Sequence, residues 1–253
     1  MTLLEAVAIA VAGLLAGTIN TIVGSGTLIT FPTLLFFGYA PVSANVSNNL
    51  GLVAGGVSGA WGYRHELTGL RRTLLMLLPA SLVGSVTGAL LLLTLPESAF
   101  ETIVPVLIGI ALLLVVLGPR INRWAAKRHT DKLTTGHAIA LIVGVLLAGV
   151  YGGYFGAAQG VLLIGIMSAL LPLHLQQING IKNVLGLVVN LVAAVVFVVV
   201  QPEQIDWAVV GLIAAGSVFG GVIGAKVGRS MPPWLLRSFI VGIGLVAIAV
   251  LVT

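Results

Sequence analysis

Two short glycine-containing segments of this chain could bind a ligand through their backbone. The first is Gly24-Ser25-Gly26, followed by Thr27, and the second is 156–160, which includes Gln159. Small residues permit backbone angles that a helix interior does not use, so each segment predicts a break in a helix. A helix that restarts after a break presents unpaired N–H groups with partial positive charge. Both breaks, with the hydroxyls of Ser25 and Thr27, therefore predict an anion site. The alternative is that the glycines only let two helices approach closely.

Polar residues form two stripes on apolar segments farther along the chain. In 177–200 the stripe is Asn179, Lys182, Asn183, Gly186 and Asn190, and in 44–63 it is Asn45, Asn48, Asn49, Gly56 and Gly59. Each stripe occupies one helical face, and polar groups in lipid are costly unless they meet a partner or a cavity. We expect the two stripes to face each other inside the protein. The alternative is that the asparagines join helices through hydrogen bonds, each worth on the order of 1 kcal/mol.

Lys182 is the one basic side chain clearly inside a predicted span. It could pair with an anionic substrate and exchange a proton, or its ammonium could extend to the membrane surface. The breaks and the stripes together give the candidate substrate-binding residues, which are Gly24, Ser25, Gly26, Thr27, Asn45, Asn48, Asn49, Gly156, Gln159, Gly160, Asn179, Lys182 and Asn183.

The elements that carry these residues belong to a membrane protein. Hydrophobic residues make up 58% of the 253 residues, charged residues make up 8%, and the mean hydropathy is +1.16. So few charges cannot coat a water-soluble surface. The basic residues lie between apolar spans rather than on one face, so no nucleic-acid partner is expected and the partner of the surface is the lipid bilayer.

Ten apolar segments are predicted from the length that crosses a bilayer, about 20 residues. They are 3–23, 27–38, 44–63, 73–94, 102–118, 137–156, 160–171, 177–200, 207–227 and 234–252. The segments 27–38 and 160–171 span only about 18 Å at 1.5 Å per residue. Each is therefore predicted to form half of a broken hairpin.

Three loops, 64–72, 119–136 and 228–233 with its flanks, are rich in Lys and Arg, which predicts that they face the cytoplasm. An even number of segments separates each from the next, so one orientation satisfies all three. Both termini and most of the acidic residues are then extracytoplasmic. We expect a multi-pass protein of the cell inner membrane.

Three strings occur twice in the same order. They begin at 14 and 146, at 48 and 183, and at 84 and 216, so their offsets are 132, 135 and 132 residues. The chain is therefore predicted to be a duplicated, all-α polytopic membrane protein. Its parts are a first repeat, 1–118, a basic linker, 119–136, and a second repeat, 137–253. Five segments per repeat is an odd number, which predicts inverted topology and a transporter with its site between the repeats.

Several chemistries lack support in the sequence. There is no cysteine, and no Walker-type phosphate loop, HExxH zinc pair or GxSxG elbow occurs. Apart from Glu5 at the start of the first, no Asp or Glu lies within a predicted span, which leaves acid–base catalysis poorly supplied. We therefore expect no enzyme, no metal and no cofactor. The small-xxx-small strings at Gly84 and Gly216 predict close helix packing, and Trp61, Tyr63 and Trp207 are expected at the membrane interfaces.

Leu14-Leu15-Ala16-Gly17 is followed by Gly24-Ser25-Gly26 and Pro32, and a second pass follows at 146–149 and 156–160. With this doubled pattern the chain resembles the sulfite exporter TauE/SafE family of membrane permeases. The family's glycine cluster is richer, and Ile166 stands where a second proline is usual. The resemblance implies transport of sulfite, sulfonates or other small sulfur-containing anions across the inner membrane.

These observations predict a permease that moves a small sulfur-containing anion by alternating access at a midplane site, without ATP. A coupled proton or sodium ion and a homodimer are further candidate partners. Two alternatives stay open, a passive anion channel and a membrane subunit or assembly factor without transport activity of its own. Inverted repeats permit import and export alike.

Overall fold

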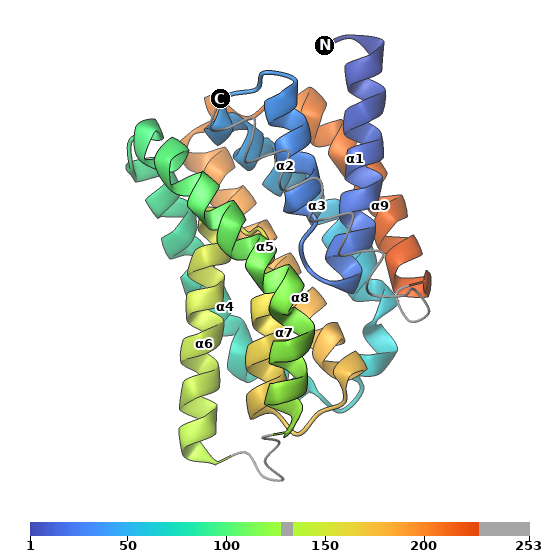
Figure 1. Cartoon of the computed structure of the whole chain (residues 1–253), viewed down its shortest axis with the longest axis vertical. Coiled ribbons are helices and arrows are strands. Elements are labelled where there is room, and N and C mark those ends of the chain that lie inside the picture. The colour runs from blue at the N-terminus through green and yellow to red at the C-terminus, as the bar shows by residue number, and fades with distance from the viewer. Residues whose placement is uncertain (128–133, 228–253) are drawn as a thin grey trace.

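The computed structural model describes residues 1–127 and 134–227, which form helices and loops without a β-strand (Figure 1). The predicted segment 234–252, the basic loop 228–233 and part of the linker lie outside the described residues. The helices are α1 (Leu3–Ile22), α2 (Thr27–Phe36), α3 (Pro41–Gly62), η1 (Arg64–Leu67), α4 (Arg71–Thr94), α5 (Glu97–Lys127), α6 (Thr135–Tyr154), α7 (Gln159–Leu170), α8 (Leu175–Val200), η2 (Pro202–Gln204) and α9 (Trp207–Val227).

The helix bounds confirm the predicted all-α membrane fold. Six helices in the described residues are long and apolar enough to cross a bilayer, namely α1, α4, α5, α6, α8 and α9. The ends agree with the predicted segments within a few residues, except that α5 continues into the linker as far as Lys127. Helix α3 is 22 residues long but less apolar, because it carries a stripe of asparagines and glycines. Most of this stripe is buried inside the bundle.

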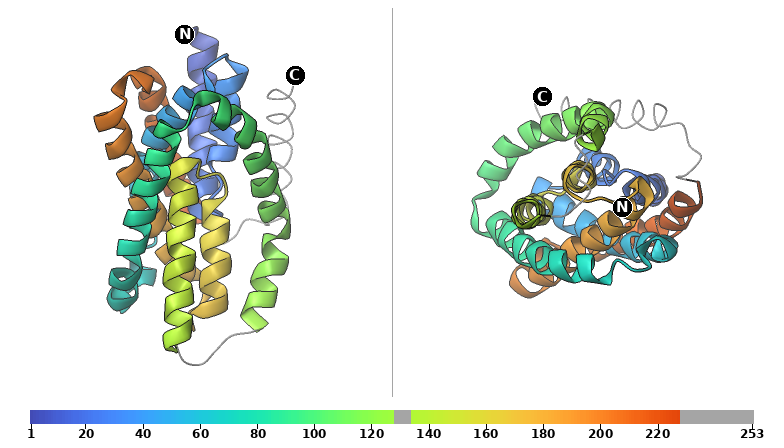
Figure 2. Two further views of the ribbon diagram at one scale, coloured as in Figure 1. Left: turned by 90° about the vertical axis from the view of Figure 1, so that its left-hand side faces the viewer. Right: turned by 90° about the horizontal axis from the view of Figure 1, so that it is seen from below.

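Both predicted breaks are present, and each is followed by a helix that turns back. Gly24 has φ of +83° after α1, and Gly156 has φ of +77° after α6, a backbone conformation that favours glycine. Helix α2 returns along α1, and α7 returns along α6 (Figures 1 and 2). The two short helices are therefore the returning halves of hairpins, as their lengths predict.

Helix pairing follows the sequence duplication. Helix α1 packs along α9, and α6 packs along α4, which are equivalent pairs when α1 is matched with α6 and α4 with α9. The two hairpins also point in opposite directions, since α1 starts at the top of Figure 1 and α6 starts at the bottom.

The small-xxx-small strings make these contacts, as predicted. Gly220 lies against the backbone of Leu14 and Thr18, and Gly84 lies against the backbone of Leu146 and Val150. Because 14 and 146, like 18 and 150, differ by 132 residues, Gly84 is equivalent in packing to Gly220. The repeated strings in the sequence instead match Gly84 with Gly216, which lies one helical turn before Gly220 in α9. A glycine every four residues makes these two registers look alike in sequence.

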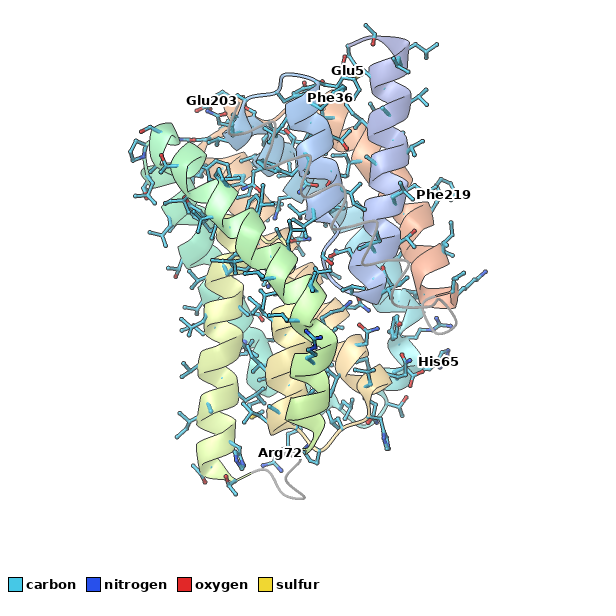
Figure 3. All side chains as sticks on the ribbon, in the orientation of Figure 1. Glu5, Phe36, His65, Arg72, Glu203 and Phe219 are labelled. Atoms are coloured by element: carbon cyan, nitrogen blue, oxygen red, sulfur yellow. The ribbon has the colours of Figure 1, made fainter. Side chains whose placement is uncertain are left out.

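The outer surface has an apolar belt between two polar ends. Exposed apolar side chains such as Phe219 cover the sides, while Glu5 and Glu203 lie at one end and His65 and Arg72 at the other (Figure 3). Trp61 and Trp207 are 68% and 60% exposed, as expected for interfacial residues.

The interfacial placement of Tyr63 is wrong. Tyr63 is buried, and Asn179 donates a hydrogen bond to its hydroxyl over 2.9 Å. A tyrosine can leave the interface in this way when a partner inside the protein satisfies its hydroxyl.

Candidate functional site

The two helix breaks touch each other in the middle of the bundle. The amide of Gly160, at the start of α7, donates a hydrogen bond of 3.0 Å to the carbonyl of Gly24. A Cβ atom on Gly24 would collide with the backbone of Gly160. Glycine is therefore required at this crossing for its size as well as for its positive φ.

A small pocket lies beside this crossing, with a cavity volume of about 30 Å³. The predicted site residues that line it are Gly24, Thr27, Gly156, Gln159, Gly160, Lys182 and Asn183. The remaining lining residues are Asn20, Thr21, Gly56, Gly186, Leu187 and Asn190. The pocket thus joins the first break, the second break and the stripes of α3 and α8.

The side chain of Lys182, in α8, reaches the last turn of α1. Its side chain is 2% exposed, and its ammonium donates hydrogen bonds of 2.9 Å and 2.8 Å to the carbonyls of Asn20 and Thr21. Asn183 donates a further bond of 3.2 Å to Thr21. These carbonyls have no partner within their own helix because α1 stops at the break. The alternative in which Lys182 extends to the membrane surface is therefore wrong.

Two hydrogen bonds leave one N–H of the Lys182 ammonium for a ligand in the pocket. The ammonium also sits at the negative end of α1, where a cation is favoured. Lys182 can thus act as a cap of α1 and as a cationic wall of the pocket at the same time.

The second break contributes a side-chain amide. Gln159 is 5% exposed, packs over Gly152, and within the described residues its Nε2 has no hydrogen-bond partner. The backbone amides of Gln159 and Val161 already donate to carbonyls of the protein, as the amide of Gly160 does to Gly24. A ligand at this break would therefore meet the Gln159 amide group before the backbone.

Several predicted site residues hold helices together outside the pocket. Asn45 donates to the carbonyl of Tyr154 over 2.9 Å, and Asn179 donates to Tyr63. Asn48 bonds the hydroxyls of Thr27 and Thr30 in α2. These three asparagines do what the alternative interpretation describes, joining α3 or α8 to a neighbouring segment.

The two stripes do meet, as expected from the sequence. Asn49 donates to Asn190 across the α3–α8 contact over 3.4 Å. Ser25 is fully buried, does not line the pocket, and its hydroxyl has no partner among the described residues. Gly26 lies against Ala16 in α1 and is likewise outside the pocket.

Some residues line the pocket but are absent from the predicted set, and the sequence features that could have identified them differ in strength. Asn190, Gly186 and Gly56 belong to the stripes and could have been included on that ground. Asn20 and Thr21 are polar residues in the last helical turn before the first break, which is a usable signal. Leu187 has none, because a leucine in an apolar helix looks alike whether it faces lipid or a pocket.

Residues 9–251 match the family model described as sulfite exporter TauE/SafE. The chain belongs to the sulfite exporter TauE/SafE family. This membership confirms the resemblance seen in the sequence, and the matched residues include both glycine-containing breaks.

Relatives within the TauE/SafE family span most of this chain. A "Probable membrane transporter protein" of Haemophilus influenzae is 28% identical over 229 residues, covering 90% of this chain and 87% of its own length. The "Probable membrane transporter protein YfcA" of Escherichia coli K12 is 29% identical over 236 residues, covering 90% and 82%. No solved structure matches the chain significantly. Family membership and these relatives identify a membrane transporter protein.

Proposed function

We propose that the protein is a secondary transporter of small sulfur-containing anions, such as sulfite or a sulfonate, and that it works by alternating access. The observation that carries the proposal is the pocket where the two breaks cross, with a buried lysine and the Gln159 amide on its walls. A sulfonate or sulfite group has oxygens that accept hydrogen bonds and a negative charge that an ammonium favours.

The arrangement of the helices supports alternating access. Two equivalent hairpins point in opposite directions and meet at the pocket. Broken helices meeting at a site between repeats are a recurring feature of secondary transporters, in which one repeat rocks against the other. On this proposal the basic end faces the cytoplasm and the membrane is the inner membrane.

Uptake of ³⁵S-labelled sulfite and sulfonates into proteoliposomes containing the purified protein tests the proposal. We expect saturable uptake, and we expect Gln159→Leu to reduce it at least tenfold, because leucine keeps the side-chain volume but removes the donor. Accumulation against a gradient would distinguish a carrier from a passive channel.

Gln176→Leu is the matched control. The side-chain amide oxygen of Gln176 is also buried without a hydrogen-bond partner among the described residues, but Gln176 lies outside the pocket. Anion uptake by Gln176→Leu should equal uptake by the unsubstituted protein. Equal losses in both variants would place the site elsewhere, and no uptake of any anion would favour the subunit alternative.

A further inference from the structure

The pocket carries one formal charge. Among the described residues that line it, Lys182 is the only titratable side chain, and the others are asparagines, glycines, Thr21, Thr27, Gln159 and Leu187. No acidic side chain of the described residues lines the pocket, and both described partners of the Lys182 ammonium are neutral carbonyls.

The helix ends around the pocket add little net charge. Each break joins the C-terminus of one helix to the N-terminus of the next, α1 to α2 and α6 to α7. The two ends carry opposite partial charges of about half a unit each. Each break is therefore close to neutral as a whole, although it presents directed dipoles. The ammonium of Lys182 remains as one positive charge without an acidic partner in the pocket.

This charge balance has a consequence for the ligand. A bound ligand with one negative charge neutralises the pocket, whereas a ligand with two leaves an uncompensated negative charge buried in the protein. Burying an unpaired charge is expensive, because water no longer solvates it. A zwitterion fails in the opposite way, because its anionic group pairs with Lys182 while its own cation stays buried without a counter-charge.

Resting on the proposed anion transport, we propose that this pocket selects monoanions over dianions and over zwitterions of the same size, and that Lys182 sets this selectivity. In the structure, the single buried ammonium of Lys182 matches a single anionic group of the ligand, and Gln159 is a neutral hydrogen-bond donor beside it.

Three compounds of similar size test the inference, because they carry the same sulfonate on a two-carbon chain and differ in net charge. Taurine is a zwitterion, isethionate is a monoanion and sulfoacetate is a dianion at neutral pH. Initial uptake is measured in proteoliposomes with the membrane potential held at zero, so that charge does not change the driving force. We expect the isethionate rate to exceed each of the others at least tenfold.

Lys182→Gln then removes the charge while keeping a donor for the α1 carbonyls. We expect the ratio of isethionate to taurine uptake to fall at least tenfold, because the pocket then has no net charge. The ratio is measured within one protein, so a general loss of activity does not obscure it. An unchanged ratio in a folded variant would show that Lys182 is only a cap of α1 and would overturn the inference.

The outcomes separate this inference from the proposed function. Uptake of sulfoacetate equal to or faster than that of isethionate overturns the monoanion selectivity but leaves anion transport standing. Absence of uptake of all three compounds and of sulfite by the folded protein overturns both. If Lys182→Gln does not fold, the rates of the three compounds in the unsubstituted protein still decide whether the pocket selects monoanions.

Discussion

At the scale of single residues, the protein uses buried polar side chains to satisfy helix ends that lie within the membrane. Lys182 and Asn183 bond the last carbonyls of α1, and Asn45 bonds the last carbonyl of α6. In hydrocarbon no water is present to do this, and each unsatisfied backbone group costs several kcal/mol. At each of the two breaks, another helix supplies such a donor, α8 at the first and α3 at the second.

A polar contact at the end of the molecule links α1 to the loop before α3 and makes stability depend on pH. Tyr39 donates a hydrogen bond of 2.8 Å to Glu5. Burial first, and then this bond, raise the pKa of Tyr39 from 10.0 to about 12. Because the folded pKa is the higher one, the contribution of Tyr39 to the free energy of unfolding is complete below pH 10 and is lost as the pH rises towards 12.

Tyr39→Phe removes this contact and its titration. We expect the unsubstituted protein to melt at a higher temperature than Tyr39→Phe at about pH 8, with the difference shrinking between pH 10 and 12. Thermal unfolding in detergent over this range measures it. A difference that stays constant across the range would mean that Tyr39 does not titrate differently in the folded and unfolded states.

At the scale of helices, close backbone contact holds the bundle. Apolar side chains of one helix gain little from leaving lipid for a neighbouring helix, since both surroundings are apolar. Glycine removes the side chain at the contact and lets backbones approach, as Gly220 of α9 does at Leu14 of α1. The extensive pairing of α1 with α9 and of α4 with α6 has this origin.

Gly220→Ala and Gly211→Ala in α9 give a matched test of this origin. A Cβ atom on Gly220 would collide with the α1 backbone, whereas a Cβ atom on Gly211 meets open space. We expect Gly220→Ala to destabilise the protein by about 1–3 kcal/mol through overpacking. Gly211→Ala should be neutral or stabilising by up to about 1 kcal/mol, since alanine favours helix.

Thermal unfolding of the two variants in the same detergent is the measurement. Equal melting temperatures would show that the α1–α9 contact does not depend on the missing side chain.

At the scale of the whole molecule, the two ends differ in charge. Glu5 and Glu203 lie at one end, where Asp206 lines the same cavity as Glu203, and the loop of His65 and Arg72 lies at the other (Figure 3). That loop also contains Arg64 and Arg71. Positive residues are retained on the cytoplasmic side during insertion. The orientation of the molecule is therefore a prediction from its loops.

The absence of cysteine from the chain makes this orientation directly testable. Glu203→Cys and Thr68→Cys each place one exposed thiol, at opposite ends of the molecule. We expect a membrane-impermeant maleimide to label Glu203→Cys in intact spheroplasts and to label Thr68→Cys only after the membrane is permeabilised. The reverse pattern would mean that the protein is inserted the other way round.

Much of the fold could be predicted from the sequence because it depends on neighbouring residues. A stretch of apolar residues predicts a span, and the clusters of small residues around Gly24 and Gly156 predict a break because they permit non-helical backbone angles. Hydropathy was least informative for α3, whose asparagines look unsuited to a membrane until the surrounding helices cover them.

By itself, then, the sequence predicted the helical segments that the structure describes, the two breaks and the faces that carry polar residues, and the duplication stays a prediction. Only the tertiary structure decided which of those residues line the pocket, that Lys182 reaches the carbonyls of α1, and which glycine of α9 is equivalent to Gly84. The physical reason is that periodicity defines the face of a helix but leaves open how neighbouring helices rotate and slide against it. Lys182 and Asn20 are far apart in the chain, and only the packing of α8 against the first break brings them together.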